Sequence, residues 1–116
     1  HPKIAWVSYA GLPGDKFNAA QKRYSPKGAG AVFTFGVKGG NEAGVALVKA
    51  VKLFSHLANV GDTRSLIIHP ASTTHSQVAP ELKAAAGAAP DVVRVSIGLE
   101  DVEDLIADLD QGLATV

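Results

Sequence analysis

Apolar residues recur along this chain with two different periods, and the alternation predicts its elements. Four apolar runs are typical of strands, and in residues 33–37 and 93–97 apolar side chains occupy every second position. The predicted strands span residues 4–9, 31–37, 65–69 and 91–97. Between them apolar residues return every three or four positions, which predicts helices. The predicted helices span residues 16–24, 41–58, 80–87 and a last one from about residue 100.

The helical periodicity also predicts which side chains are buried. Asn41 is suited to cap the helix that follows it. On the first, short helix the buried side is predicted to be Phe17 and Ala20. The two longer stripes are predicted to be Leu47, Ala50, Val51, Phe54, Leu57 and Ala58, and then Val102, Leu105, Ile106, Leu109 and Leu113.

This order of strands and helices leaves two architectures open. A doubly wound parallel sheet shares the alternating order. However, the strands are few and the connection between residues 37 and 65 is long. We therefore expect an α/β (α+β) fold with a small mixed, largely antiparallel sheet and helices mainly on one face. Residues 1–116 are predicted to be a single domain.

Composition narrows the possible partners. The 116 residues are 47% hydrophobic, and 11 Lys and Arg balance 11 Asp and Glu. These values indicate a folded domain, and zero net charge argues against nucleic-acid binding through bulk basicity. No apolar run approaches the ~18 residues of a membrane span, so neither nucleic acid nor membrane is an expected partner.

The chain has no cysteine and no methionine, even at its first position. Thiolate metal sites and cysteine nucleophiles are therefore excluded. A chain without cysteine is compatible with the cytosol, and we expect a cytoplasmic protein. Because it opens with His1, we interpret it as a piece of a longer protein.

Arg94 is the residue that most strongly indicates chemistry. It alternates with Val93 and Val95, so it is predicted to lie on the opposite face of its strand. An arginine in that position suits a carboxylate or phosphate held bidentately. A salt bridge to a nearby acid, or an exposed sheet face, explains the same pattern.

Other candidate sites are weaker. His69 and His75 have no cysteine or carboxylate cluster beside them, so structural roles are expected and no metal site is predicted. A triad of Ser72, His75 and Asp62 lacks a nucleophile elbow. No lysine has the desolvated context of a Schiff-base lysine. We therefore predict no catalytic, cofactor-binding or metal residue in this chain.

Longer motifs give the chain a family resemblance. They are residues 1–12 (with His1-Pro2 and Gly11-Leu12), 33–40 (FTFGVKGG), 53–62 (LFSHLANVGD), 65–75 (SLIIHPASTTH) and 93–101 (VRVSIGLED). Together they resemble the carboxy-terminal domain of the Cys/Met-metabolism enzymes that use pyridoxal phosphate (PLP). Within that family the O-acetylhomoserine sulfhydrylase branch is the most similar.

The resemblance implies roles for particular residues. In such enzymes a larger upstream domain binds PLP through a lysine, and the carboxy-terminal domain closes over the amino-acid substrate. Arg94 matches the family arginine that holds the substrate α-carboxylate. Asn59 and Val60 match the segment that approaches the same carboxylate, and Thr74 lies in a loop near the site.

The implied reaction is replacement at the γ carbon of O-acetylhomoserine by sulfide or methanethiol, which yields homocysteine or methionine and acetate. The implied enzyme is a homotetramer, and this piece alone is expected to be inactive because the cofactor lysine is upstream. Three alternatives remain open. They are cystathionine γ-synthase, O-succinylhomoserine sulfhydrylase and a non-catalytic α/β binding module.

Overall fold

Four strands form one sheet in the computed structural model, which describes residues 1–59 and 61–116. The strand order is β1-β2-β4-β3, and each neighbouring pair is antiparallel. The prediction of a small, largely antiparallel sheet is therefore confirmed, and the doubly wound alternative is wrong. The strands are β1 (Ile4–Ser8), β2 (Val32–Val37), β3 (Leu66–Ile68) and β4 (Val92–Ser96).

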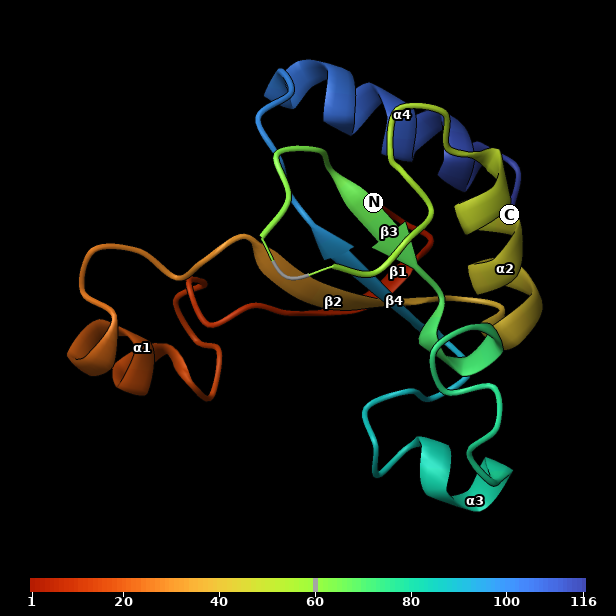
Figure 1. Ribbon diagram of the computed structural model, residues 1–116, viewed down its shortest axis with the longest axis horizontal. Coiled ribbons are helices and arrows are strands. Elements are labelled where there is room, and N and C mark those ends of the chain that lie inside the picture. Colours follow the sequence, from red (N-terminus) through yellow and green to blue (C-terminus); the bar gives the residue numbers. More distant parts are fainter. Residues whose placement is uncertain (60) are drawn as a thin grey trace.

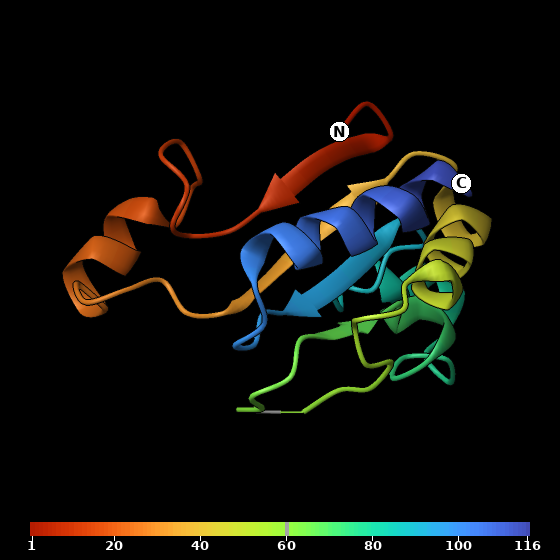
Figure 2. The same ribbon diagram turned by 90° about the horizontal axis from the view of Figure 1, so that it is seen from above.

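Two helices cover one face of this sheet. Helices α2 (Gly40–Ala50) and α4 (Val102–Ala114) pack against each other and lie over β2 and β4 (Figure 2). Helix α1 (Asn18–Tyr24) stands apart at the end of an arm between β1 and β2 (Figure 1). Helix α3 (Pro80–Lys83) and a 3₁₀ turn, η1 (Pro70–Ser72), lie in the connection from β3 to β4.

The core lies between the sheet and these two helices. Alternate strand residues point into it, as the period of two requires. Apolar side chains from α2 and α4 meet them there and bury the centre of this face of the sheet. The buried cluster includes Phe35, Val37, Ile67, Val93, Val95, Leu47, Val48, Leu105 and Leu113.

Helix α2 ends at Ala50, well before the predicted residue 58. The carboxylate of Asp108, on α4, accepts the backbone N–H groups of Lys52 (2.8 Å), Leu53 (2.8 Å) and Phe54 (3.2 Å). Those donors would point to carbonyls of the preceding turn if the helix continued. A side chain distant in the sequence therefore ends the helix and starts an extended segment.

Three further predictions about helix faces are wrong. Helix α1 buries none of its residues, and Phe17, just before it, is 55% exposed. On α4, Leu105 and Leu113 are buried as predicted, but Val102 and Ile106 are 61% and 54% exposed. Helix α2 begins after Gly39, whose φ of +103° favours glycine, so Asn41 lies inside the helix and does not cap it.

A short parallel contact closes the loop between α2 and β3. The Ser55 N–H donates to the Ser65 carbonyl (2.9 Å), and the Ile67 N–H donates to the Ser55 carbonyl (3.0 Å). Both ends of the intervening loop are therefore fixed beside β3. No helix among the described residues is long and apolar enough to cross a membrane.

Candidate functional site

Arg94 lies near the centre of the sheet, on the face that α2 and α4 leave open. Antiparallel pairing places Ser8, Thr34, Arg94 and Ile68 in one row across all four strands. Directly paired residues share a face. The prediction that Arg94 faces away from Val93 and Val95 is therefore confirmed, since those two valines lie in the core beneath the helices.

Arg94 has no acidic partner in the described part of the chain. The ion pairs there are His1 with Asp110 and Arg64 with Asp62. The predicted alternative, a salt bridge from Arg94 to a nearby acid, is therefore not formed. A partly buried guanidinium without a counter-ion favours binding of an external anion, and its planar fork suits a carboxylate.

Asn59 lies beside Arg94, at the edge of the open face. The loop that carries it passes over β3 and β4, and Asn59 and Arg94 line the same small hollow together with Leu57, Leu66 and Ile68. Its volume is about 10 Å³, which is room for about one water molecule. The described residues therefore form a shallow hollow beside Arg94 rather than a closed pocket.

Two other predicted site residues are not placed in this hollow. Val60 lies outside the described residues. Thr74 is exposed in the connection after η1, where its hydroxyl contacts Nδ1 of His75 at 2.9 Å, and it does not line the hollow. A role for either residue in substrate binding stays a prediction.

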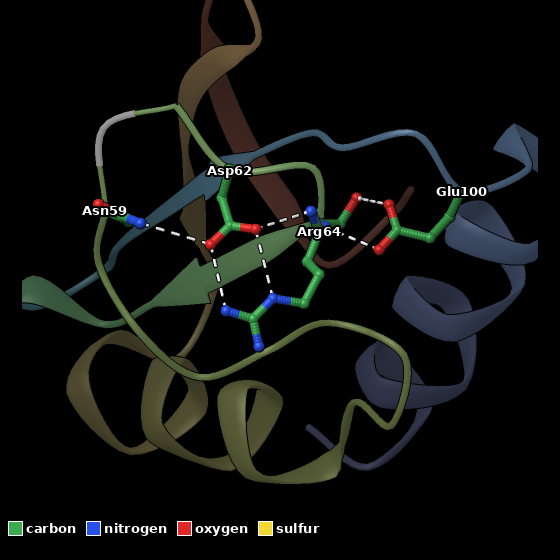
Figure 3. A network of polar contacts seen from close by, with 5 residues as sticks. Asn59, Asp62, Arg64 and Glu100 are labelled. Atoms are coloured by element: carbon green, nitrogen blue, oxygen red, sulfur yellow. Dashed lines mark hydrogen bonds and ion pairs between the residues drawn. The ribbon is translucent and has the colours of Figure 1, made fainter.

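A network of polar contacts holds the loop that carries Asn59 (Figure 3). The Asp62 carboxylate accepts the Arg64 backbone N–H at 3.0 Å and the Arg64 guanidinium at 3.1 Å and 3.3 Å. The amide nitrogen of Asn59 donates to the same carboxylate at 3.4 Å. Asp62 is therefore the centre of the network, with the Asn59 amide on one side and the Arg64 guanidinium on the other.

Exposure and charge differ between the two ends of this ion pair. The Asp62 side chain is 12% exposed, whereas that of Arg64 is 59% exposed. Hydrogen bonds from the Arg64 side chain and backbone hold the pKa of Asp62 well below its usual range. Asp62 is therefore an anion throughout the physiological range, and Arg64 neutralises it from the solvent side.

A second contact joins the end of this loop to the segment before α4. The Glu100 carboxylate accepts the Ser65 backbone N–H at 2.8 Å and the Ser65 hydroxyl at 2.7 Å. The hydroxyl oxygen of Ser65 in turn accepts the Gly98 N–H at 2.8 Å. These bonds from Ser65 lower the pKa of Glu100. Glu100 was expected in the first turn of the last helix, but it lies before that helix and anchors β3.

His69 has a structural role, as predicted. It is buried, with Nδ1 2.8 Å from the Ser72 hydroxyl and Nε2 2.8 Å from the Pro90 carbonyl. Both ring nitrogens thus have partners within the protein. No group of three potential metal ligands occurs among the described residues.

The lysines do not fit covalent binding of a carbonyl cofactor. Lys3 and Lys83 are partly buried, but each donates its ammonium to backbone carbonyls. The other six lysines are exposed on helices and loops. A Schiff-base lysine needs a desolvated or cation-flanked amine. None of the eight lysines among the described residues therefore has the surroundings of a Schiff-base lysine.

Asp62, Arg64 and Glu100 are absent from the predicted site. The spacing of Asp62 and Arg64 is a usable signal, since an aspartate often accepts a backbone N–H two residues later. No local pattern links Glu100 to Ser65, because 35 residues separate them.

A wider hollow among the described residues lies elsewhere. A cleft of about 520 Å³ is bounded by Val7, Tyr9, Leu12 and Phe33 among others, on the face of the sheet that carries the helices. Its lining is almost wholly apolar. It therefore lacks the charged group that orients a polar substrate, and Arg94 remains the stronger indicator of the site.

Comparison with known proteins identifies a family. The family model described as Cys/Met metabolism PLP-dependent enzyme matches residues 1–114. In a solved Campylobacter jejuni structure, a chain named as an O-acetylhomoserine (thiol)-lyase is similar with a TM-score of 0.89 and 41% identity, over 98% of this chain and 27% of that one. That structure contains N'-pyridoxyl-lysine-5'-monophosphate at position 205 of its own chain.

Curated relatives agree with this match. O-acetyl-L-homoserine sulfhydrylase 1 of Thermus thermophilus is 56% identical over 97% of this chain and 27% of its own length. The homocysteine synthase of Schizosaccharomyces pombe is 47% identical over 97% of this chain and 26% of its own length. The chain thus spans about a quarter of the length of the curated relatives that it matches.

Proposed function

Because this chain belongs to the Cys/Met metabolism PLP-dependent enzyme family, we propose that it is the carboxy-terminal, substrate-closing domain of an O-acetylhomoserine sulfhydrylase. The reaction would join O-acetylhomoserine with sulfide or methanethiol and release homocysteine or methionine and acetate. Residues 1–116 would form one domain of that enzyme. The names of the relatives support this choice of substrate.

One observation in this chain carries the proposal. Arg94 presents a guanidinium that has no acidic partner among the described residues, beside Asn59 on the open face of the sheet. An amino-acid substrate carries an α-carboxylate, which a guanidinium binds in a bidentate manner. Holding that carboxylate fixes the rest of the substrate in space, and orientation of this kind contributes a large part of catalysis.

The remaining parts of the site are proposed to come from outside this chain. PLP would be held by the upstream domain, and it supplies the electron sink when bound. Val60 and Thr74 would complete the substrate side of the pocket. We also propose that the full enzyme is a homotetramer and works in the cytoplasm.

Substitution of Arg94 in the full-length enzyme tests the proposal. In Arg94→Ala, kcat/KM for O-acetylhomoserine and sulfide should fall about 30-fold or more, because a hydrogen-bonded contact with a charged group contributes about 2 kcal/mol. Arg94→Lys should recover part of the loss, since it keeps the charge but not the fork. Steady-state kinetics at saturating sulfide measure both.

Arg23→Ala is the matched control, because Arg23 is exposed on α1 and contacts only the ring of Tyr24 among the described residues. It should leave kcat/KM unchanged. If Arg94→Ala retains the parent kcat/KM, Arg94 does not hold the substrate. Turnover with O-succinylhomoserine, or with cysteine as acceptor, at a higher kcat/KM than the proposed pair would assign the enzyme to another branch of the family.

A further inference from the structure

We propose that Asp62 is a positioning residue, whose carboxylate fixes the orientation of the Asn59 amide toward the substrate carboxylate. The inference rests on the proposed function, because it assumes that Asn59 and Arg94 bind an amino-acid carboxylate together. It assigns a role to a residue that does not itself line the hollow.

The chemistry of a carboxylate determines which way the Asn59 amide faces. An ionised carboxylate only accepts hydrogen bonds, whereas an asparagine amide has a donating nitrogen and an accepting oxygen. Asn59 must therefore turn its nitrogen toward Asp62, and this is the contact at 3.4 Å. The reversed amide would place two acceptors against each other. Asp62 thereby selects one of two amide orientations that have nearly the same shape.

Asp62 is itself held firmly enough to impose this choice. It accepts three bonds from Arg64, one from the backbone and two from the guanidinium. Its side chain is only 12% exposed, and a rotation would break all of these bonds together. The fork of Arg64 fixes the plane of the carboxylate as well as its charge.

The loop beneath this network is also fixed at its base. Ser55 pairs with Ser65 and Ile67 at the start of β3, and Glu100 holds Ser65 from the other side. Gly98 packs so closely there that an added Cβ would lie 2.2 Å from the Thr63 carbonyl oxygen. Both ends of the loop are therefore held in place, and Asp62 acts between them on the Asn59 amide.

The neutralised charge of Asp62 fits its place near an anion site. An unpaired carboxylate beside the Asn59 amide would repel the α-carboxylate of a substrate. Pairing with Arg64 removes most of that repulsion. Arg94 is then left as the cation that the substrate meets, since it has no acidic partner among the described residues.

A double-mutant cycle in the full-length holoenzyme tests the inference. Asn59→Ala should raise KM for O-acetylhomoserine about 10-fold, and Asp62→Asn should raise it about 5-fold, with less than a 2-fold change in kcat for each. In the Asn59→Ala background, Asp62→Asn should have almost no further effect on KM. A residue that positions Asn59 loses its effect when Asn59 is absent, whereas a general loss of loop structure would multiply the two effects.

Asp104→Asn is the matched control, because Asp104 is an exposed acid in the first turn of α4, and its KM should match the parent. If Asp62→Asn does not fold, Arg64→Met removes the fork from the solvent side. It should raise KM about 3-fold with Asn59 present and not in its absence.

The outcomes separate this inference from the proposed function. Independent, multiplying effects of Asp62→Asn and Asn59→Ala would overturn the positioning role. An unchanged KM in Asn59→Ala, with a raised KM in Arg94→Ala, would also overturn it and would leave the proposed function intact. Parent kinetics in Arg94→Ala would instead defeat the proposed function itself.

Discussion

Gly44 lies on the side of α2 that faces His69, where the backbone of the helix touches the imidazole ring. A Cβ at this position would lie 2.5 Å from Cδ2 and 2.9 Å from Nε2 of that ring. The ring cannot retreat easily, because Ser72 and Pro90 hold its two nitrogens. A single missing methyl group therefore allows α2 to pack against the start of η1.

We expect Gly44→Ala to lower the free energy of unfolding by about 2 kcal/mol, as overpacking of a core does. Helix propensity alone predicts that the same change raises the free energy of unfolding by about 1 kcal/mol. Urea denaturation of the full-length enzyme measures whether the free energy of unfolding rises or falls. Gly28→Ala is the control, because a Cβ at Gly28 meets nothing within 4 Å. An increase in stability for Gly44→Ala would mean that the ring can move aside.

Residue-scale prediction from the sequence succeeded where the signal was local. The alternation of Arg94 with Val93 and Val95 predicts which face of the sheet it occupies, and the strand register confirms the prediction. The hollow that Arg94 shares with Asn59 followed from the family resemblance, not from spacing. The link from Ser65 to Glu100 was not predictable, because it depends on two segments far apart in the sequence meeting at the same end of the sheet.

At the scale of elements, the carboxylate of Asp108 sets the boundary between α2 and the loop that leads to the site. It is nearly buried and accepts three backbone N–H groups and the Gln111 amide. Burial raises the pKa of Asp108, but these hydrogen bonds outweigh burial and leave it below the usual value of 3.8. The folded protein therefore stabilises the ionised form of the Asp108 carboxyl group.

Asp108→Asn should lower the free energy of unfolding by about 3 kcal/mol at pH 7, because the amide nitrogen would face N–H donors that need an acceptor. A carboxyl with a depressed folded pKa stabilises the fold above its unfolded pKa, and this contribution disappears as the pH falls through the folded value. The difference between variant and parent should therefore shrink as the pH falls below the usual carboxyl value of 3.8. Urea midpoints measured across pH give this difference. Asp110 is an exposed neighbour, so Asp110→Asn should show neither the loss of stability nor its dependence on pH. A pH-independent difference would contradict the argument.

The same residue explains why the length of α2 was overestimated. The helical spacing continues through Phe54, Leu57 and Ala58. Of these, Phe54 is buried, as a helix would also make it. Periodicity cannot distinguish a continued helix from an extended segment that buries the same side chains. The acceptor that competes with the helix carbonyls is the Asp108 carboxylate, more than fifty residues further along the chain. The strands were predicted more closely, because alternation along a two-sided sheet is a local property.

At the scale of the whole molecule, the helices leave the β1 side of the sheet open. Val7 borders both the cleft of about 520 Å³ and a second hollow of about 200 Å³ next to α4. Leu12 and Ile106 are exposed along the same side. Contiguous apolar surface of this kind is uncommon on monomeric proteins.

We expect the isolated residues 1–116 to bind the dye ANS through this surface, and Val7→Lys to reduce the fluorescence by roughly half. Val32→Lys is the matched control. Val7 and Val32 are both exposed strand valines, at 47% and 45%, but Val32 pairs with Ser96 on the opposite face. Equal fluorescence from the two variants would show that the dye does not bind at this surface.

The strand order also determines when the site can exist during synthesis. Strand β4 is the last to be made, yet it is the partner that joins β3 to β2 in the sheet. Until it leaves the ribosome, β2 has one free edge and β3 lacks its sheet partner, and unpaired edges of this kind associate with other chains. Arg94 lies in the middle of that strand. Completion of the sheet and arrival of the guanidinium that we propose binds the substrate are thus one event, so unpaired strand edges of the nascent chain persist until the proposed site is formed.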